Sequence, residues 1–231
     1  CVGCNRSQAQ ERCSDLNFIQ HKKRTFLIYY ERWFAFCITL RGMSLVNKFF
    51  RQCRKGMVIV MRIKNIWQRI CADLRRINIR TTLIFAIAVL VGGILVSIFG
   101  GNRGLYSVII RPAFAPPAFV FAIVWTILYF LIGAAAGAVF GFEDKCLEAV
   151  KYKGLFLFVL MLFFNYIWYP LFFGGGMFFI ALLDILVMII LSLAIRKLFG
   201  KIYFTAKLIM TVYIIWLVYA ALLNFSVVLL N

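Results

Sequence analysis

The chain has 231 residues, of which 64% are hydrophobic and 15% are charged, yet its formal net charge is +18. A water-soluble domain carries about 45–50% apolar and about 25% charged residues, so this composition excludes a single aqueous domain. Because a helical span needs about 20 residues, the length leaves room for about four to six membrane spans.

Residues 1–80 form a basic leader that holds 17 Lys/Arg, 4 Asp/Glu and six of the seven cysteines. No apolar run in it is long enough to span a bilayer, and it lacks the compact apolar region of a secretory signal. Two interpretations stay open. The reading frame extends upstream of a true start at Met43, Met57 or Met61, so that the leader is absent from the mature protein, or the leader is a basic flank attracted to anionic lipid.

Two more specific interpretations of the leader, a zinc site and a nucleic-acid-binding segment, have less support. Cys1, Cys4, Cys13 and His21 have the thiolate and imidazole chemistry of a zinc site but not its paired spacing, so we expect no metal site. The basic run is accompanied by no recognisable nucleic-acid-binding motif, so we expect no nucleic-acid partner.

Residues 81–231 contain five long, nearly charge-free apolar runs. Backbone groups in lipid must be bonded within their own segment, so we expect each run to form a helix. The sequence therefore predicts an all-α integral membrane protein, a five-transmembrane-helix bundle with spans at Thr82–Phe99, Ala118–Phe140, Gly154–Phe172, Met177–Leu198 and about Tyr203–Leu230.

Basic residues near the span ends are distributed unevenly. One side of the predicted bundle has eleven Lys/Arg in its short flanks, and the other has only Arg103 and Arg111. Positive flanks favour the cytoplasmic face, so we expect the N-terminal side of the first span to be cytoplasmic and the C-terminus to lie opposite. The sequence does not indicate which membrane it occupies.

Glycines in the second span and prolines in the loop before it predict two further features, a close helix contact and a stiff connector. Gly133 and Gly137 lie among alanines in the second span, a composition that favours close helix packing. Three prolines between Arg111 and Pro117 predict an ordered, non-helical connector that covers one end of the bundle.

Polar and indole side chains repeat at helical spacing inside the spans. Trp125 lies about 10 Å into its helix, deeper than an interfacial belt requires. Asn165 and Trp168 share one face, and so do Trp216, Ala220 and Asn224. Asn165, Asn224 and the intramembrane acid Asp184 should face the interior, either as structural hydrogen-bond partners or as the polar part of an aromatic pocket.

The chain resembles the TspO/MBR family, the group of the tryptophan-rich sensory protein and of the translocator protein, or peripheral benzodiazepine receptor. The resemblance rests on RPAFAPPAFVFAIVWTILY (Arg111 to Tyr129), FFNYIWYPLFFG (Phe163 to Gly174) and YIIWLVYAALLN (Tyr213 to Asn224), which occur in order across residues 82–231. It implies five membrane helices and a homodimer. It also implies a ligand pocket beneath the first loop, lined by Trp125, Asn165, Trp168, Trp216 and Ala220 and closed by Tyr106 and Phe114.

The same resemblance implies the function. We expect a membrane receptor or sensor that binds tetrapyrroles, protoporphyrin IX or haem, in an aromatic intramembrane pocket and modulates porphyrin handling, with no required cofactor. One alternative is a small membrane transporter of porphyrin or other hydrophobic ligands, with Asp184 as its coupling acid. Another is a light-dependent porphyrin-degrading enzyme with Trp125 and Trp216 as catalytic candidates. No basic residue follows Lys207, so the cholesterol-recognition pattern is missing and we do not expect sterol binding.

Overall fold

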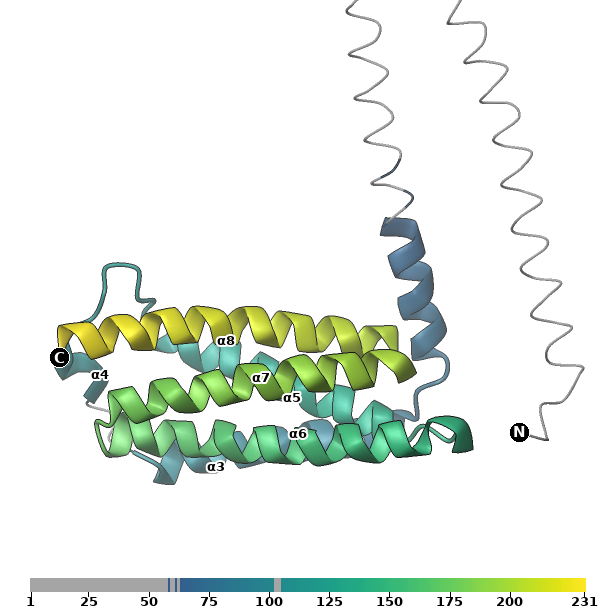
Figure 1. Cartoon of the computed structure of the whole chain (residues 1–231), viewed down its shortest axis with the longest axis horizontal. Coiled ribbons are helices and arrows are strands. Elements are labelled where there is room, and N and C mark those ends of the chain that lie inside the picture. Colours follow the sequence, from purple (N-terminus) through teal and green to yellow (C-terminus); the bar gives the residue numbers. More distant parts are fainter. Residues whose placement is uncertain (1–57, 59–60, 62, 102–104) are drawn as a thin grey trace, which may run out of the picture. The chain divides into compact units, whose positions relative to one another are not determined.

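The computed structural model describes residues 58, 61, 63–101 and 105–231, with the backbone alone at Tyr106 and Ser107. The chain divides into two compact units, Cys1–Ile63 and Lys64–Asn231. The second unit holds five long helices that run side by side (Figure 1). They are α3 (Ile79–Phe99), α5 (Ala118–Phe140), α6 (Glu148–Tyr169), α7 (Phe178–Ile202) and α8 (Phe204–Leu230).

The five predicted membrane spans are confirmed, and the described residues contain no strand. Large apolar side chains cover the outer faces of the helices, for example Ile84 on α3, Phe156 on α6 and Ile215 on α8. In water such faces would have to be buried, whereas in a bilayer they meet lipid tails directly. The described part of the chain is therefore an all-α bundle built for lipid.

Some helix ends differ from the predicted ones because charge ends an apolar run without ending a helix. α6 begins at Glu148, before the predicted Gly154, after a short 3₁₀ turn η1 (Lys145–Leu147) whose preceding Asp144 accepts a hydrogen bond from the backbone of Cys146. α7 continues through Arg196 to Ile202, and Arg196 Nε donates to Thr211 Oγ1 at 2.8 Å. Each helix thus extends by about one or two turns beyond its apolar stretch.

The helices close into a ring around a packed interior. α3 packs on α5, α5 on α8, α8 on α7 and α7 on α6, and α6 returns to touch α3. Phe199, Met161, Tyr213 and Ile132 are among the largest fully buried side chains of this interior. Tyr166 Oη donates to the carbonyl of Val89 at 2.7 Å, and this bond joins α6 to α3.

The predicted small-residue packing of the second span is confirmed. A Cβ atom on Gly133 would lie 2.8 Å from the Ala86 Cα, and one on Gly137 would lie 2.7 Å from the Thr81 carbonyl oxygen. The obstacles are backbone atoms of α3, which cannot turn aside as a side-chain end can. These two glycines therefore set how closely α3 and α5 approach each other.

Part of the predicted leader, residues 64–80, lies in the same compact unit as the bundle. Asp73 accepts hydrogen bonds from the Thr205 backbone nitrogen at 2.7 Å and from Thr205 Oγ1 at 2.9 Å. Tyr203, between α7 and α8, donates to the Arg76 carbonyl at 3.2 Å, and burial raises the pKa of its hydroxyl, which keeps it protonated. The rest of the leader lies outside the described residues apart from Val58, Met61 and Ile63, and so do the zinc candidates and the candidate start residues Met43 and Met57.

The loop between α3 and α5 is held against the C-terminal end of α8. Its described residues include a short helix, α4 (Leu105–Val108), and the predicted connector Arg111–Pro117 is not helical. Asn231 binds both the backbone nitrogen and the carbonyl of Ile110 at 3.0 Å. Tyr219 Oη donates to the Phe114 carbonyl at 3.2 Å. These bonds fasten the loop to the C-terminal part of α8.

Substituting Gly133 or Gly137 with alanine should lower the free energy of unfolding of the bundle. In Gly133→Ala and Gly137→Ala the gain in helix propensity is outweighed by contact with the α3 backbone, at a cost of about 1–3 kcal/mol. Thermal unfolding of the purified protein in detergent measures this loss of stability. Gly175→Ala is the matched control, because its Cβ would meet the movable end of Met177. Equal losses in all three variants would contradict this account.

Candidate functional site

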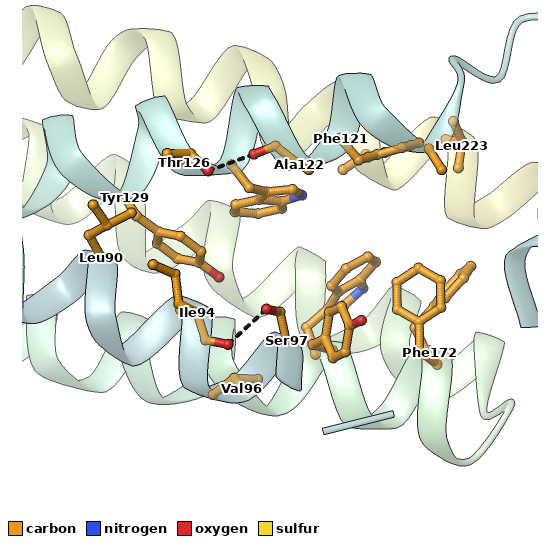
Figure 2. Close-up of a pocket in the computed structure, with 17 residues that line it drawn as sticks. Leu90, Ile94, Val96, Ser97, Phe121, Ala122, Thr126, Tyr129, Phe172 and Leu223 are labelled. Carbon is orange, nitrogen blue, oxygen red and sulfur yellow. Dashed lines mark hydrogen bonds between the residues drawn. The ribbon is translucent and has the colours of Figure 1, made fainter. Parts of the chain in front are cut away.

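A cavity of about 430 Å³ lies between α3, α5, α6 and α8, in the half of the bundle nearer to the α3–α5 loop (Figure 2). Binding sites for small molecules commonly enclose about 300–1,000 Å³. Among the described residues the lining is almost entirely apolar and aromatic and includes no charged side chain. The residues that line it are Leu90, Gly93, Ile94, Val96, Ser97, Ala118, Phe121, Ala122, Trp125, Thr126, Tyr129, Trp168, Tyr169, Phe172, Phe173, Ala220 and Leu223.

Three tryptophans from three helices meet at this cavity. The ring centroids of Trp125 and Trp168 are 6.2 Å apart with an interplanar angle of 30°. Trp216 meets Trp125 edge to face, with centroids 6.3 Å apart at 87°. Trp125 and Trp168 line the cavity, whereas Trp216 is not among the lining residues and supports Trp125 from behind. Both geometries are within the range of favourable aromatic pairs.

A short π-helical turn extends the aromatic wall. η2 (Pro170–Gly174) follows α6 directly, and its wider winding changes the face on which later side chains project. Trp168 stacks on Phe172 with centroids 5.2 Å apart, and Phe173 meets the same indole edge to face at 6.1 Å. The end of α6 and the η2 turn therefore contribute three rings to one surface.

A buried amide fixes the inner end of the cavity. Tyr129 Oη donates to Asn165 Oδ1 at 2.6 Å, and Asn165 Nδ2 donates to Tyr213 Oη. Asn165 is 2% exposed and Tyr213 is fully buried, so the three side chains tie α5, α6 and α8 together away from water. Tyr129 lines the cavity while its hydroxyl is held by Asn165, and the amide therefore orients the ring.

The cavity is open along the seam between α3 and α5. Its exposed lining residues are Ala118, Ala122 and Thr126 on α5 and Ile94 on α3. Further along the same seam the helices are in contact at Gly133, and the Tyr129 ring fills the space beside Gly93. The seam is thus closed at one half of the bundle and open at the other, on a side that faces lipid.

The predicted site residues differ in their position relative to the cavity. Trp125, Trp168 and Ala220 line the cavity. Asn165 and Trp216 contact lining residues from behind. The Phe114 side chain is 54% exposed and is not among the lining residues, although its carbonyl holds Tyr219. The Tyr106 side chain lies outside the described residues.

Sequence reasoning did not select several aromatic lining residues, including Phe121, Tyr129 and Phe172. Phe121 and Tyr129 lie four residues before and four after Trp125, so helical spacing places all three on one face. That spacing was the available signal on α5. Phe172 has the same spacing from Trp168, but the π turn between them alters the projection of the helix.

The remaining predicted interior polar residues are buried as expected. Asp184 is 8% exposed and Asn224 is fully buried. Asp184 Oδ2 and both polar atoms of the Asn224 side chain have no hydrogen-bond partner among the described residues, and neither do the indole nitrogens of Trp168 and Trp216. These buried polar atoms are therefore unsatisfied within the part of the chain that the structure describes.

Comparison with known proteins gives one family. The model of the TspO/MBR family matches residues 83–230. The tryptophan-rich protein TspO of Chlorobaculum tepidum is 32% identical over 126 residues, which cover 54% of this chain and 78% of that protein. The tryptophan-rich sensory protein of Cereibacter sphaeroides is 32% identical over 126 residues, covering 54% and 76%. The translocator protein of Sus scrofa is 30% identical over 149 residues, covering 62% and 85%.

Removing the buried amide should destabilise the site. Asn165→Leu leaves the hydroxyls of Tyr129 and Tyr213 without their shared partner, at a cost of about 1–3 kcal/mol in the free energy of unfolding. Thermal unfolding measured by intrinsic fluorescence detects it. The matched control is Asn224→Leu, which removes an equally buried amide that has no partner among the described residues. If Asn224→Leu is as damaging as Asn165→Leu, the hydrogen bonds of Asn165 do not account for the loss.

Proposed function

The chain belongs to the TspO/MBR family, and we propose that it is a membrane receptor or sensor that binds a tetrapyrrole in the Trp125–Trp168 cavity and modulates porphyrin handling. Protoporphyrin IX and haem are the expected ligands. The observation that carries the proposal is the wall of indole, phenol and phenyl rings around one apolar cavity. A flat macrocycle gains from stacking on such rings.

The spacing of the Trp125 and Trp168 rings limits whether the ligand can insert between them. Stacked carbon atoms approach to about 3.5 Å, so a ring inserted between Trp125 and Trp168 needs about 7 Å between their planes. Their centroids are 6.2 Å apart, which is an upper limit on the present separation. The macrocycle therefore stacks against the exposed face of the wall, or the two indoles separate to admit it.

The polar groups of the ligand limit its orientation. None of the described residues that line the cavity has a charged side chain, and a carboxylate without a partner is costly in an apolar site. The carboxylates of protoporphyrin therefore point out along the α3–α5 seam toward the headgroups, while the macrocycle occupies the apolar interior.

The proposal extends to topology and assembly. The N-terminal side of α3 faces the cytoplasm, since basic residues are concentrated at that end of the bundle. The chain acts as a homodimer in which lipid covers the remaining apolar outer faces. Cholesterol is not among the expected ligands.

A small-molecule transporter is the second candidate, and Asp184 is the observation that favours it. This acid lies inside the bundle, and its Oδ2 atom has no partner among the described residues. Intramembrane acids without a structural partner often mark proton or ion pathways. In this alternative a porphyrin or another hydrophobic ligand moves when Asp184 gains or loses a proton.

Replacing a cavity indole should weaken porphyrin binding. Trp125→Phe and Trp168→Phe each reduce the stacking area and should weaken affinity up to about tenfold. Titration of the purified protein with protoporphyrin IX in the dark, followed by tryptophan quenching and the porphyrin absorbance, measures it. Trp67→Phe is the control, because Trp67 is 65% exposed and does not line the cavity.

Two results would change the proposal, one from this titration and one from the same mixture under illumination. The absence of saturable binding to the unmodified protein would refute tetrapyrrole recognition. Loss of porphyrin absorbance under illumination that decreases in Trp125→Phe and Trp216→Phe would add the light-dependent degradation.

The transporter candidate makes a separate prediction. Proteoliposomes that take up protoporphyrin in response to a pH gradient should lose that response in Asp184→Asn, which cannot carry the proton. Ser192→Ala, another buried polar position on α7, serves as the control. Uptake that is unchanged in Asp184→Asn removes the proposed coupling acid.

A further inference from the structure

Residues 64–76, here called the pre-span segment, have an exposed apolar stripe that the cavity does not use. Residues 64–74 are helical, and Ile66, Trp67, Ile70 and Leu74 share one face of that helix. Trp67 is 65% exposed, Leu74 is 56% exposed and Ile66 is 41% exposed. A helix in water would bury such a stripe against the protein, and this one does not.

The opposite face of the pre-span segment is basic. Lys64, Arg69, Arg75 and Arg76 are exposed, and Asp73 is the one acid of the segment. Asp73 is already engaged with Thr205, so within the segment no acid is left to compensate the positive charge. An amphipathic helix with a basic polar face is typical of helices that lie in the membrane interface.

Contacts with the bundle fix the depth of the pre-span segment. Asp73 accepts the Thr205 backbone N–H in the first turn of α8, where no side chain of α8 itself caps the helix. The Arg69 guanidinium carbon lies 4.8 Å from the centroid of the Phe204 ring. The spans α3 and α8 begin at Ile79 and Phe204, so the segment lies where two helices enter the bilayer.

The direction of the helix agrees with this depth. Within the second compact unit, the helix of residues 64–74, blue in Figure 1, runs across the direction of the long helices. It lies at the end of the bundle where α7 and α8 join. A helix that crosses the spans at their entry level extends along the membrane surface. Its apolar stripe then meets the boundary between headgroups and acyl chains.

We propose that the pre-span segment is an interfacial helix that binds an anionic lipid surface. Ile66, Trp67 and Leu74 enter the boundary of the acyl chains, and Lys64 and Arg75 contact negatively charged headgroups. Asp73 links this helix to α8 by capping it. The proposal is independent of the tetrapyrrole, because it uses none of the residues that line the cavity.

Hydrogen exchange of the full chain in nanodiscs tests the proposal. Amide exchange within residues 64–74 is compared between nanodiscs of phosphatidylcholine alone and nanodiscs that also contain phosphatidylglycerol, each with one protein copy. We expect exchange to be slower by about tenfold in the anionic nanodiscs. The double variant Lys64→Gln/Arg75→Gln should lose most of this difference.

A matched variant separates local binding from general charge. Lys145→Gln/Lys153→Gln removes the same charge from exposed positions near the start of α6, and it should keep the lipid-dependent protection of residues 64–74. Trp67→Ser should speed exchange in anionic nanodiscs, since it removes the largest apolar contact.

Three results would overturn the proposal. Protection that is equal in neutral and anionic nanodiscs would mean that another part of the chain covers the stripe. Protection that appears only with two copies per nanodisc would assign the stripe to a second copy. Loss of protection in the Lys145→Gln/Lys153→Gln variant that equals the loss in Lys64→Gln/Arg75→Gln would show that net charge acts without a local site.

Discussion

The hydrocarbon of the bilayer is the constraint on which the rest of the structure depends, because it removes the hydrophobic effect between helices. Association must then come from close contact and from interior hydrogen bonds. Gly133 and Gly137 supply close contact, since each brings α5 within touching distance of the α3 backbone. Asn165 supplies the interior bonds, and it joins three helices through two tyrosines. The cavity lies beyond these glycine contacts and the Asn165 hydrogen bonds, where aromatic rings take the place of small residues.

Most of the fold was predictable because a membrane span has a simple signal in the sequence. The first residue of α5 and the last residues of α3, α5 and α8 match the predicted ones. The starts of α3 and α6 and the end of α7 lie beyond the predicted ones, because a helix continues into the headgroup region where charge is tolerated, as α7 does through Arg196. The end of α6 comes earlier than predicted, because the chain passes there into η2. The attachment of Asp73 to Thr205 was beyond prediction, since it joins residues 132 positions apart by local geometry.

The cavity was predictable in part. Depth in the span selected Trp125, and helical spacing joined Asn165 to Trp168. Spacing alone did not distinguish a residue that lines the cavity from one that supports it. Trp125 and Trp216 were therefore both predicted to line the pocket, although only Trp125 does. The rings after Pro170 depend on a π turn, and no pattern of apolar residues encodes that winding. Small differences in helix geometry therefore determine the shape of the site.

The open seam between α3 and α5 has a consequence for how occupancy is counted. A ligand that reaches Ile94 and Thr126 from the acyl chains is present at its mole fraction in the membrane, and its concentration in the surrounding water matters only through the partition coefficient. Adding lipid at constant ligand dilutes it and lowers occupancy, although no protein contact changes. Apparent affinities measured at different ratios of lipid to protein would then differ for the same molecule. The relevant reference state for this cavity is the bilayer.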